Sequence, residues 1–134
     1  MEELIIKNKA VKFNSPTQII NMGGPWVGVL FIGELKIMVD VIIDNLFYSK
    51  EDDRLYFVRY HKISKWEKEN YFTINYFDLS TNKLYMFDMK FEMVFLKEIN
   101  NSSELIYYEA FHDRDESRKK QLILGNAIEL LLDK

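Results

Sequence analysis

The chain has 134 residues but no cysteine, and it has only two histidines and two prolines. Without cysteine it can form no disulfide framework, no thiolate zinc site and no cysteine nucleophile. The two histidines, His61 and His112, have no HxH or HxxxH spacing, so a histidine metal site is not indicated. We expect both histidines to be structural or surface residues, and we expect neither a metal nor a cofactor.

Motifs with a catalytic mechanism are also missing. The sequence contains no GxSxG nucleophile elbow, no GxGxxG loop and no GK[ST] phosphate loop. Its serines lie in loop-like or charged contexts, where serine usually serves in turns. Its acidic clusters lack the spacing of a calcium-binding loop. The sequence therefore predicts a protein that is not an enzyme.

Charge and hydropathy limit the classes of partner and the location that the sequence allows. The formal net charge is −3, and no segment is basic enough to match a nucleic-acid backbone. The longest apolar run, residues 37–43, is interrupted by Asp40 and is too short for a membrane span. Residues 1–13 lack the basic, apolar and small-residue regions of a signal peptide. We therefore expect one soluble domain over residues 1–134, located in the cytoplasm, with no nucleic-acid or membrane partner.

Aromatic residues are abundant, and most of them gather in residues 54–96. This stretch contains four strand-like runs, LYFVRYHKI, YFTINYFDL, KLYMFDM and FEMVFL, separated by short polar breaks. Aromatic and β-branched residues suit a pleated, half-buried surface. The pattern predicts a mainly β protein, in which an antiparallel meander forms a sandwich or a partly open barrel.

Shorter strand-like runs flank this meander. They cover residues 2–13, 17–22, 26–32, 35–43 and 104–111, with turn signals at 14–16, 23–25, 33–34 and 100–103. Gly28 lies inside one such run, which indicates a β-bulge or a close backbone approach.

The last twenty residues have a different pattern. Acidic residues at 113–116 precede basic residues at 118–120, which is the charge order that favours a helix. Six apolar residues can share one broad helical stripe, which Gly125 and Asn126 interrupt. They are Leu122, Ile123, Ala127, Ile128, Leu131 and Leu132. A short C-terminal helix and a helix–turn–second element arrangement both fit this segment.

Two tryptophans and two acidic segments are the candidate partner-binding residues. Trp26 follows the rigid Gly23-Gly24-Pro25 turn and is either a core residue or an interface anchor. Trp66 stands among polar residues and is either folded over a sheet edge or exposed for contact. The acidic side chains are either solvated loop charges or contacts for a basic partner. These candidates are Trp26, Glu51, Asp52, Asp53, Trp66, Asp113, Asp115 and Glu116.

In size, composition and texture, and in its distinctive segment SPTQIINMGGPWVG, the chain resembles the bacterial immunity proteins that neutralise polymorphic or contact-dependent toxins. The resemblance implies a non-catalytic binding module that occludes a cognate protein toxin. If that toxin is basic, the two acidic segments would meet it. Two alternatives stay open: a β-barrel that binds a small apolar ligand in a cavity of a few hundred Å³, and a subunit that self-associates through strand edges.

Overall fold

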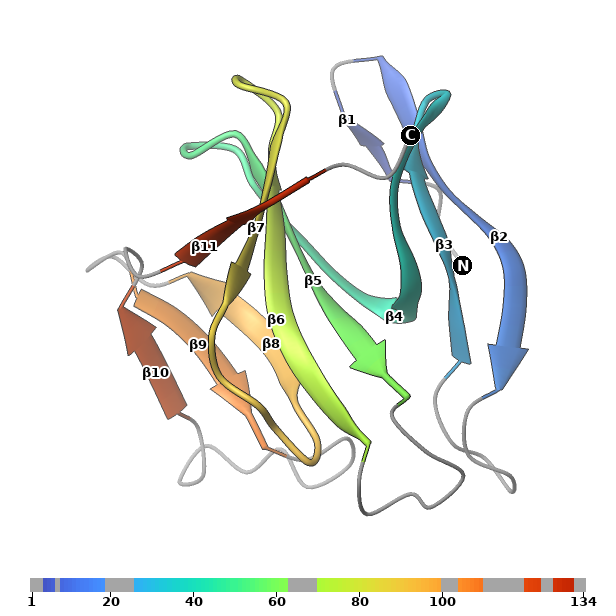
Figure 1. Ribbon diagram of the computed structural model, residues 1–134. Coiled ribbons are helices and arrows are strands. Elements are labelled where there is room, and N and C mark those ends of the chain that lie inside the picture. The colour runs from blue at the N-terminus through green and yellow to red at the C-terminus, as the bar shows by residue number, and fades with distance from the viewer. Residues whose placement is uncertain are drawn as a thin grey trace.

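The computed structural model describes residues 4–6, 8–18, 26–62, 70–99, 104–109, 120–123 and 127–131. All regular elements within these ranges are β-strands (Figure 1). They are β1 (Ile5–Ile6), β2 (Lys9–Gln18), β3 (Trp26–Ile32), β4 (Leu35–Ser49), β5 (Arg54–His61), β6 (Tyr71–Asp78), β7 (Lys83–Phe87), β8 (Phe95–Ile99), β9 (Glu104–Tyr108), β10 (Lys120–Ile123) and β11 (Ala127–Leu130).

The strands form two antiparallel sheets. The larger sheet has the order β1-β2-β3-β4-β5-β6-β7-β11, and the smaller has the order β10-β9-β8. From β1 to β7 each strand pairs with the next one along the chain, and this meander includes the first three of the four runs predicted within residues 54–96. The described strands do not close into a barrel. They therefore do not form the closed barrel that the ligand-binding alternative requires around its cavity. The mainly β, antiparallel prediction is confirmed.

Strands β5 and β6 form the middle of the fold, with apolar side chains packed on both of their faces. Tyr56 and Val58 point into one hydrophobic cluster, which also contains Leu96 and Leu105 from the smaller sheet. Leu55 and Phe57 point into a second cluster. This arrangement explains the nearly continuous apolar sequence of both strands, because neither face is left to solvent.

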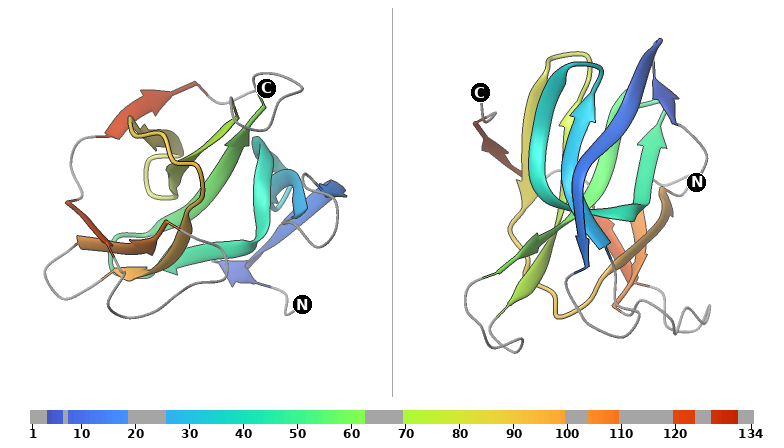
Figure 2. Two further views of the ribbon diagram at one scale, coloured as in Figure 1. Left: turned by 90° about the horizontal axis from the view of Figure 1, so that it is seen from below. Right: turned by 90° about the vertical axis from the view of Figure 1, so that its right-hand side faces the viewer.

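Two layers cover this middle. The smaller sheet lies on one face of β5 and β6. In Figure 2 this sheet is at one end of the molecule, and the N-terminal strands β1–β3 are at the other end. On the other face lie β1 to β3 and the first half of β4, which supply Ile6, Leu30 and Ile37 to the second cluster. The fold is therefore a layered sandwich with an open larger sheet.

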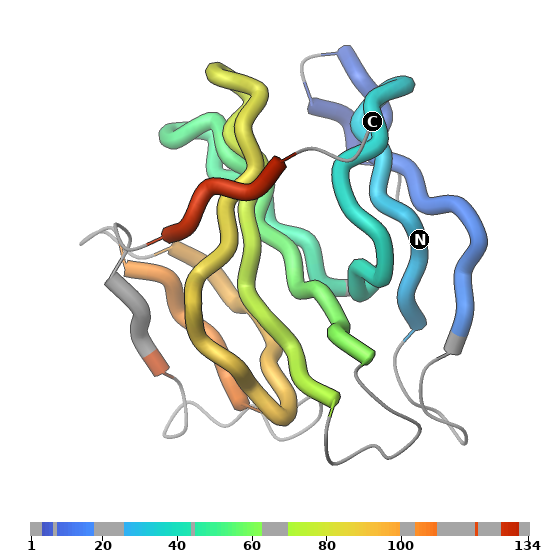
Figure 3. The backbone as a smooth tube through the Cα atoms, in the orientation of Figure 1, coloured from blue at the N-terminus to red at the C-terminus, as the bar shows by residue number. Residues whose placement is uncertain are grey.

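Strand β4 connects these layers because it bends sharply. Its first half pairs with β3, its second half pairs with β5, and the pairing with β5 shifts register between Val41 and Leu46. Figure 3 shows the change of direction along the tube. The neighbouring residues Val41 and Ile42 point into different hydrophobic clusters.

The buried Asn45 at this bend joins the two sheets. Its Oδ1 accepts a hydrogen bond from the backbone N–H of Leu96 at 2.8 Å, and its Nδ2 donates to the carbonyl of Leu96 at 3.0 Å. The side-chain amide thus pairs with β8 as a neighbouring peptide group would. Strand β4 continues beyond the run expected at 35–43 and passes through residues 44–45.

Gly28 confirms the prediction of a bulge or close approach. The pairing of β3 with β4 shifts register between Gly28 and Leu30. A Cβ at position 28 would lie 3.1 Å from the carbonyl oxygen of Asn14 and 3.3 Å from the Cβ of Phe13. Only glycine lets the backbone of β2 approach β3 this closely.

The predicted turn at residues 14–16 is wrong. Strand β2 runs through this segment as a single strand, and its pairing with β3 shifts register between Asn14 and Thr17. Ser15 has a φ of 54° there, which marks the irregularity. The described pairing of β1 with β2 covers only Lys9 and Ala10, so Pro16 removes no donor from that ladder.

Two further predictions also fail. The fourth run of the meander was expected at 91–96, but β8 begins only at Phe95, and Phe91 makes one isolated bridge to Phe72. The C-terminal helix is absent from the described residues, where β10 pairs with β9 and β11 pairs with β7. The final segment thus adds an edge strand to each sheet, and pairing with distant strands prevails over its helical periodicity.

Candidate functional site

The turn between β4 and β5 carries the first acidic segment. Glu51 and Asp52 are exposed, and Asp52 accepts a hydrogen bond from Ser49 Oγ at 3.3 Å. Asp53 has a φ of 56°, and its carboxylate accepts a hydrogen bond from the hydroxyl of Tyr48 at 2.8 Å. That hydrogen bond to a carboxylate raises the pKa of Tyr48 above its ordinary value. Asp53 therefore supports the turn, whereas Glu51 and Asp52 remain directed to solvent.

The neighbouring turn between β6 and β7 is fixed to the first. The N–H of Leu79 donates to the carbonyl of Asp53 at 2.9 Å. The carboxylate of Asp78 accepts hydrogen bonds from Ser80 Oγ at 2.6 Å, from Ser80 N–H at 3.0 Å and from Thr81 N–H at 3.3 Å. Burial alone would raise the pKa of Asp78, but these bonds and Arg54 outweigh it and hold the pKa below its ordinary value. The two turns thus form one ordered rim.

A row of aromatic rings crosses the sheet beside this rim. The register aligns Phe47, Tyr56, Tyr76 and Tyr85 on four adjacent strands. Their successive ring centroids lie 6.4, 5.2 and 4.9 Å apart. The two outer rings, Phe47 and Tyr85, are only half-buried. We call these four residues the aromatic row.

Arg54 links the aromatic row to the acidic rim. Its guanidinium carbon lies 4.5 Å from the ring centroid of Tyr76, and its Nε lies 3.7 Å from Asp78 Oδ2. Burial lowers the pKa of Arg54, but Tyr56, Tyr76 and Asp52 together raise it above its ordinary value. Arg54 therefore stays charged at the junction between aromatic and acidic groups.

The Nε of Arg54 and the hydroxyl of Tyr56 are both buried at this junction, where Arg54 interacts with Tyr56 and with Asp78. Burial raises the pKa of Tyr56 to about 12, so the hydroxyl stays protonated. The exposed carboxylates and half-exposed rings beside Arg54 make this rim the candidate functional site.

The sequence predicted only part of this site. It placed Glu51, Asp52 and Asp53 correctly in a loop, and the structure brings them next to Arg54 and the aromatic row. The contribution of Arg54 and of the aromatic row was missed. The alternation within YFTINYFD shows which residues share a face with Tyr76, but it does not give the register that places Tyr76 beside Tyr56 on the neighbouring strand.

Trp26 lies elsewhere in the fold. It is 47% exposed at the start of β3, so the core alternative is wrong and the contact alternative is retained. In Figure 1 the start of β3 lies at the bottom of the molecule, while the turn between β4 and β5 lies at the top. The structure therefore does not bring Trp26 together with Glu51 and Asp52.

His112 and four of the predicted contact residues lie outside the described residues. The predicted contact residues concerned are Trp66, Asp113, Asp115 and Glu116.

His61 belongs to a polar cluster at the opposite end of β5 and β6. Its Nε2 lies 2.7 Å from Thr73 Oγ1, and its ring stacks on Tyr71 with centroids 4.5 Å apart. Burial, followed by the charges of Arg59 and Lys90, lowers the pKa of His61 to about 4. The imidazole is therefore neutral near pH 7.

A hydroxyl beside an imidazole is the arrangement of an activated nucleophile. Here the residue that carries the hydroxyl, Thr73, is only 2% exposed, and it also accepts a hydrogen bond from Asn75 Nδ2 at 3.0 Å. A base with a pKa of about 4 is also poorly matched to proton abstraction at neutral pH. We interpret the Asn75–Thr73–His61 chain as a structural hydrogen-bond network.

The described ranges contain no group of three or more His, Cys, Asp or Glu side chains that could hold a metal ion. None of these residues forms a helix long and apolar enough to cross a membrane.

Comparison with protein-family models, with curated proteins and with solved structures finds no match for this chain. The candidate site therefore has to be interpreted from its own geometry.

Proposed function

We propose that this chain is a non-catalytic protein-binding module whose contact surface is the rim around Glu51, Asp52, Arg54 and the aromatic row. The observation that carries the proposal is the combination at this rim of exposed carboxylates, half-exposed rings and a charged arginine between them. Tyrosine and arginine dominate the energetics of many protein interfaces. A partner's cationic side chains would meet Glu51 and Asp52.

In its sharper form, the proposal is that the chain is an immunity protein that binds a cognate bacterial toxin and occludes the toxin's active site. The support is the resemblance of the whole chain to such proteins in size, composition and texture, together with this acidic and aromatic rim. A basic toxin is the partner that the exposed carboxylates favour, because complementary charge steers association.

Affinity capture tests this proposal. The purified chain is immobilised, exposed to a lysate of the source organism, and washed at rising salt concentration. We expect one basic protein to remain bound at equal stoichiometry. That protein should be toxic when produced alone in a host cell and harmless when this chain is produced with it. If the captured protein is not toxic, or if toxicity persists with the chain present, the immunity proposal fails.

Charge reversal at the rim tests the contact surface separately. The Glu51→Lys/Asp52→Lys double variant should lower the association rate with the captured protein at least about tenfold at low salt. The matched control is Glu92→Lys/Glu98→Lys, which makes the same charge change at two exposed positions outside this rim. Equal association rates for the two double variants would place the contact surface elsewhere.

A further inference from the structure

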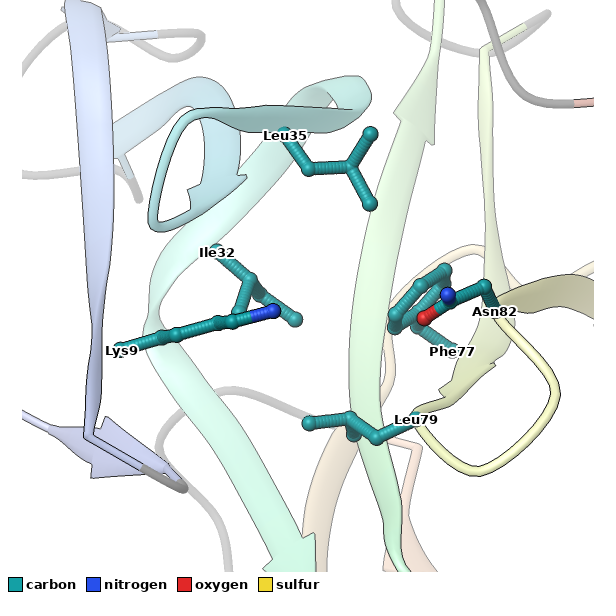
Figure 4. A pocket seen from close by; sticks show the side chains of 6 residues that line it. All are labelled: Lys9, Ile32, Leu35, Phe77, Leu79 and Asn82. Atoms are coloured by element: carbon teal, nitrogen blue, oxygen red, sulfur yellow. The ribbon is translucent and has the colours of Figure 1, made fainter.

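A pocket lies between the N-terminal strands and the turn that joins β6 to β7, away from the aromatic row. Its volume is about 130 Å³. The lining side chains come from β2, β3, β4, β6 and the β6–β7 turn (Figure 4). They are Lys9, Ile32, Leu35, Phe77, Leu79 and Asn82.

The walls of the pocket are apolar and firmly held. Ile32 and Phe77 belong to the second hydrophobic cluster and are only 4% and 2% exposed. Leu35 and Leu79 close the space from two further sides in Figure 4. Leu35 is 42% exposed, so water reaches part of this wall. An apolar group that entered the pocket would displace that water.

Two polar groups complete the pocket. Figure 4 shows the Lys9 ammonium and the Asn82 amide directed into the same space from opposite sides. Within the described ranges neither side chain makes a hydrogen bond or an ion pair. Lys9 therefore supplies a positive charge, and Asn82 supplies amide donors, that no described group uses.

The two neighbouring turns position the stem of Lys9 and the backbone of Asn82. A Cβ at Gly33 would lie 3.7 Å from three carbon atoms of the Lys9 side chain, so the lysine stem lies along the glycine backbone. Asn82 has a φ of 56°, a left-handed conformation that asparagine tolerates within a tight turn. The β3–β4 turn thus sets the course of the Lys9 stem, and the β6–β7 turn sets the backbone of Asn82.

We propose that this pocket binds a small monocarboxylate whose apolar body is about the size of a benzene ring. An apolar cavity of roughly 150 Å³ accommodates benzene, so a pocket of this size can hold a six-carbon body. Lys9 pairs with the carboxylate, and Asn82 donates a hydrogen bond to it. The apolar body packs against Ile32 and Phe77. The proposal is independent of the protein-binding function.

Titration with three ligands that share a benzene ring but differ in charge tests the charge preference. Benzoate, benzyl alcohol and benzylamine are each added to the ¹⁵N-labelled chain, and the amide shifts of Leu79 and Asn82 are followed by NMR. We expect saturable shifts with benzoate at a Kd of about 1 mM or below. Benzyl alcohol should bind at least about fivefold more weakly, and benzylamine more weakly still, because Lys9 repels a cation.

Two variants and one control assign the effect to the named groups. Lys9→Met keeps the apolar stem and should reduce benzoate affinity to the level of benzyl alcohol. Asn82→Gly keeps the left-handed turn and should weaken benzoate binding about threefold. Lys12→Met removes an exposed lysine from the same strand and should leave benzoate binding unchanged. The proposal is overturned if benzoate and benzylamine bind alike, if Lys9→Met binds benzoate as the wild type does, or if benzoate gives no saturable shifts.

Discussion

Replacing Asn45 with alanine removes the side-chain amide that joins β4 to β8. The backbone N–H and carbonyl of Leu96 both bond to Asn45, and Leu96 is only 3% exposed. After the substitution both groups are buried without these partners. Each of the two buried polar groups left unsatisfied costs about 1–3 kcal/mol, so we expect a loss of about 2–6 kcal/mol. This is a large part of the 5–15 kcal/mol that stabilises a typical domain.

Equilibrium unfolding in urea measures this loss, with far-UV circular dichroism and tryptophan fluorescence as two probes. The midpoint should fall while the slope stays unchanged, because the surface exposed on unfolding is the same. The matched control is Asn14→Ala, which shortens an exposed asparagine on β2 and should change the free energy of unfolding by less than about 0.5 kcal/mol.

An intermediate variant separates the two hydrogen bonds. Asn45→Asp keeps an acceptor for the Leu96 N–H but loses the donor to the Leu96 carbonyl, and it places a carboxylate beside that carbonyl. We expect it to be destabilised, and its destabilisation should ease as the carboxylate is protonated at low pH. If Asn45→Ala were as stable as Asn14→Ala, the inference that Asn45 joins the sheets would be refuted.

Three further substitutions test other parts of the structure. Asp78→Asn should cost about 1–3 kcal/mol at pH 7. Because the folded pKa of Asp78 lies below its ordinary value, the cost should shrink as urea titrations move below about pH 4, and a constant cost would contradict the assignment. The folded pKa of His61, about 4, lies below its unfolded value of about 6.5, so its neutral form stabilises the fold above pH 6.5 and this contribution is lost as the pH falls towards 4. Relative to His61→Gln, the wild type should therefore lose about 1–2 kcal/mol of unfolding free energy between pH 6.5 and pH 4, a value reduced because the ring is half-exposed. Parallel pH profiles of the unfolding free energy in the two proteins would exclude this role. Gly28→Ala should destabilise the chain by about 1–3 kcal/mol, since its Cβ would meet the Asn14 carbonyl at 3.1 Å, and an unchanged thermal midpoint would show that β2 yields easily.

Local sequence patterns predicted the centre of the fold correctly because there the local and tertiary preferences agree. Both faces of β5 and β6 are buried, so their aromatic and β-branched residues indicate strands whichever face is considered. The polar break between the second and third runs of the meander was also predicted correctly, since Asp78 and Ser80 form this turn through their own side chains.

The failures occurred where the deciding contacts are remote in sequence. Ser15 and Pro16 fit a turn and an irregular strand equally well, and only the pairing of β2 with β3 distinguishes them. The C-terminal segment has a helical stripe in its sequence, but its described residues form two short strands. Their partners, β9 and β7, lie in different sheets. The sequence contains no local signal for either pairing.

The same limit applies to the candidate sites. The sequence identified the acidic turn, because charged residues between two apolar runs indicate a loop. The aromatic row depends on the registers of four adjacent strands, and the pocket depends on β2 facing β6 across the fold. Neither can be derived from spacing along a single segment.

The two hydrophobic clusters lie back to back, separated only by the backbones of β5 and β6, and the bent β4 supplies neighbouring residues to both. Opening either cluster would therefore expose apolar side chains on strands that the other cluster also needs. Such a fold has no internal boundary at which one half could unfold while the other stays intact. Amide hydrogens in β4, β5 and β6 should accordingly exchange with solvent only when the whole domain unfolds, and at a common free energy.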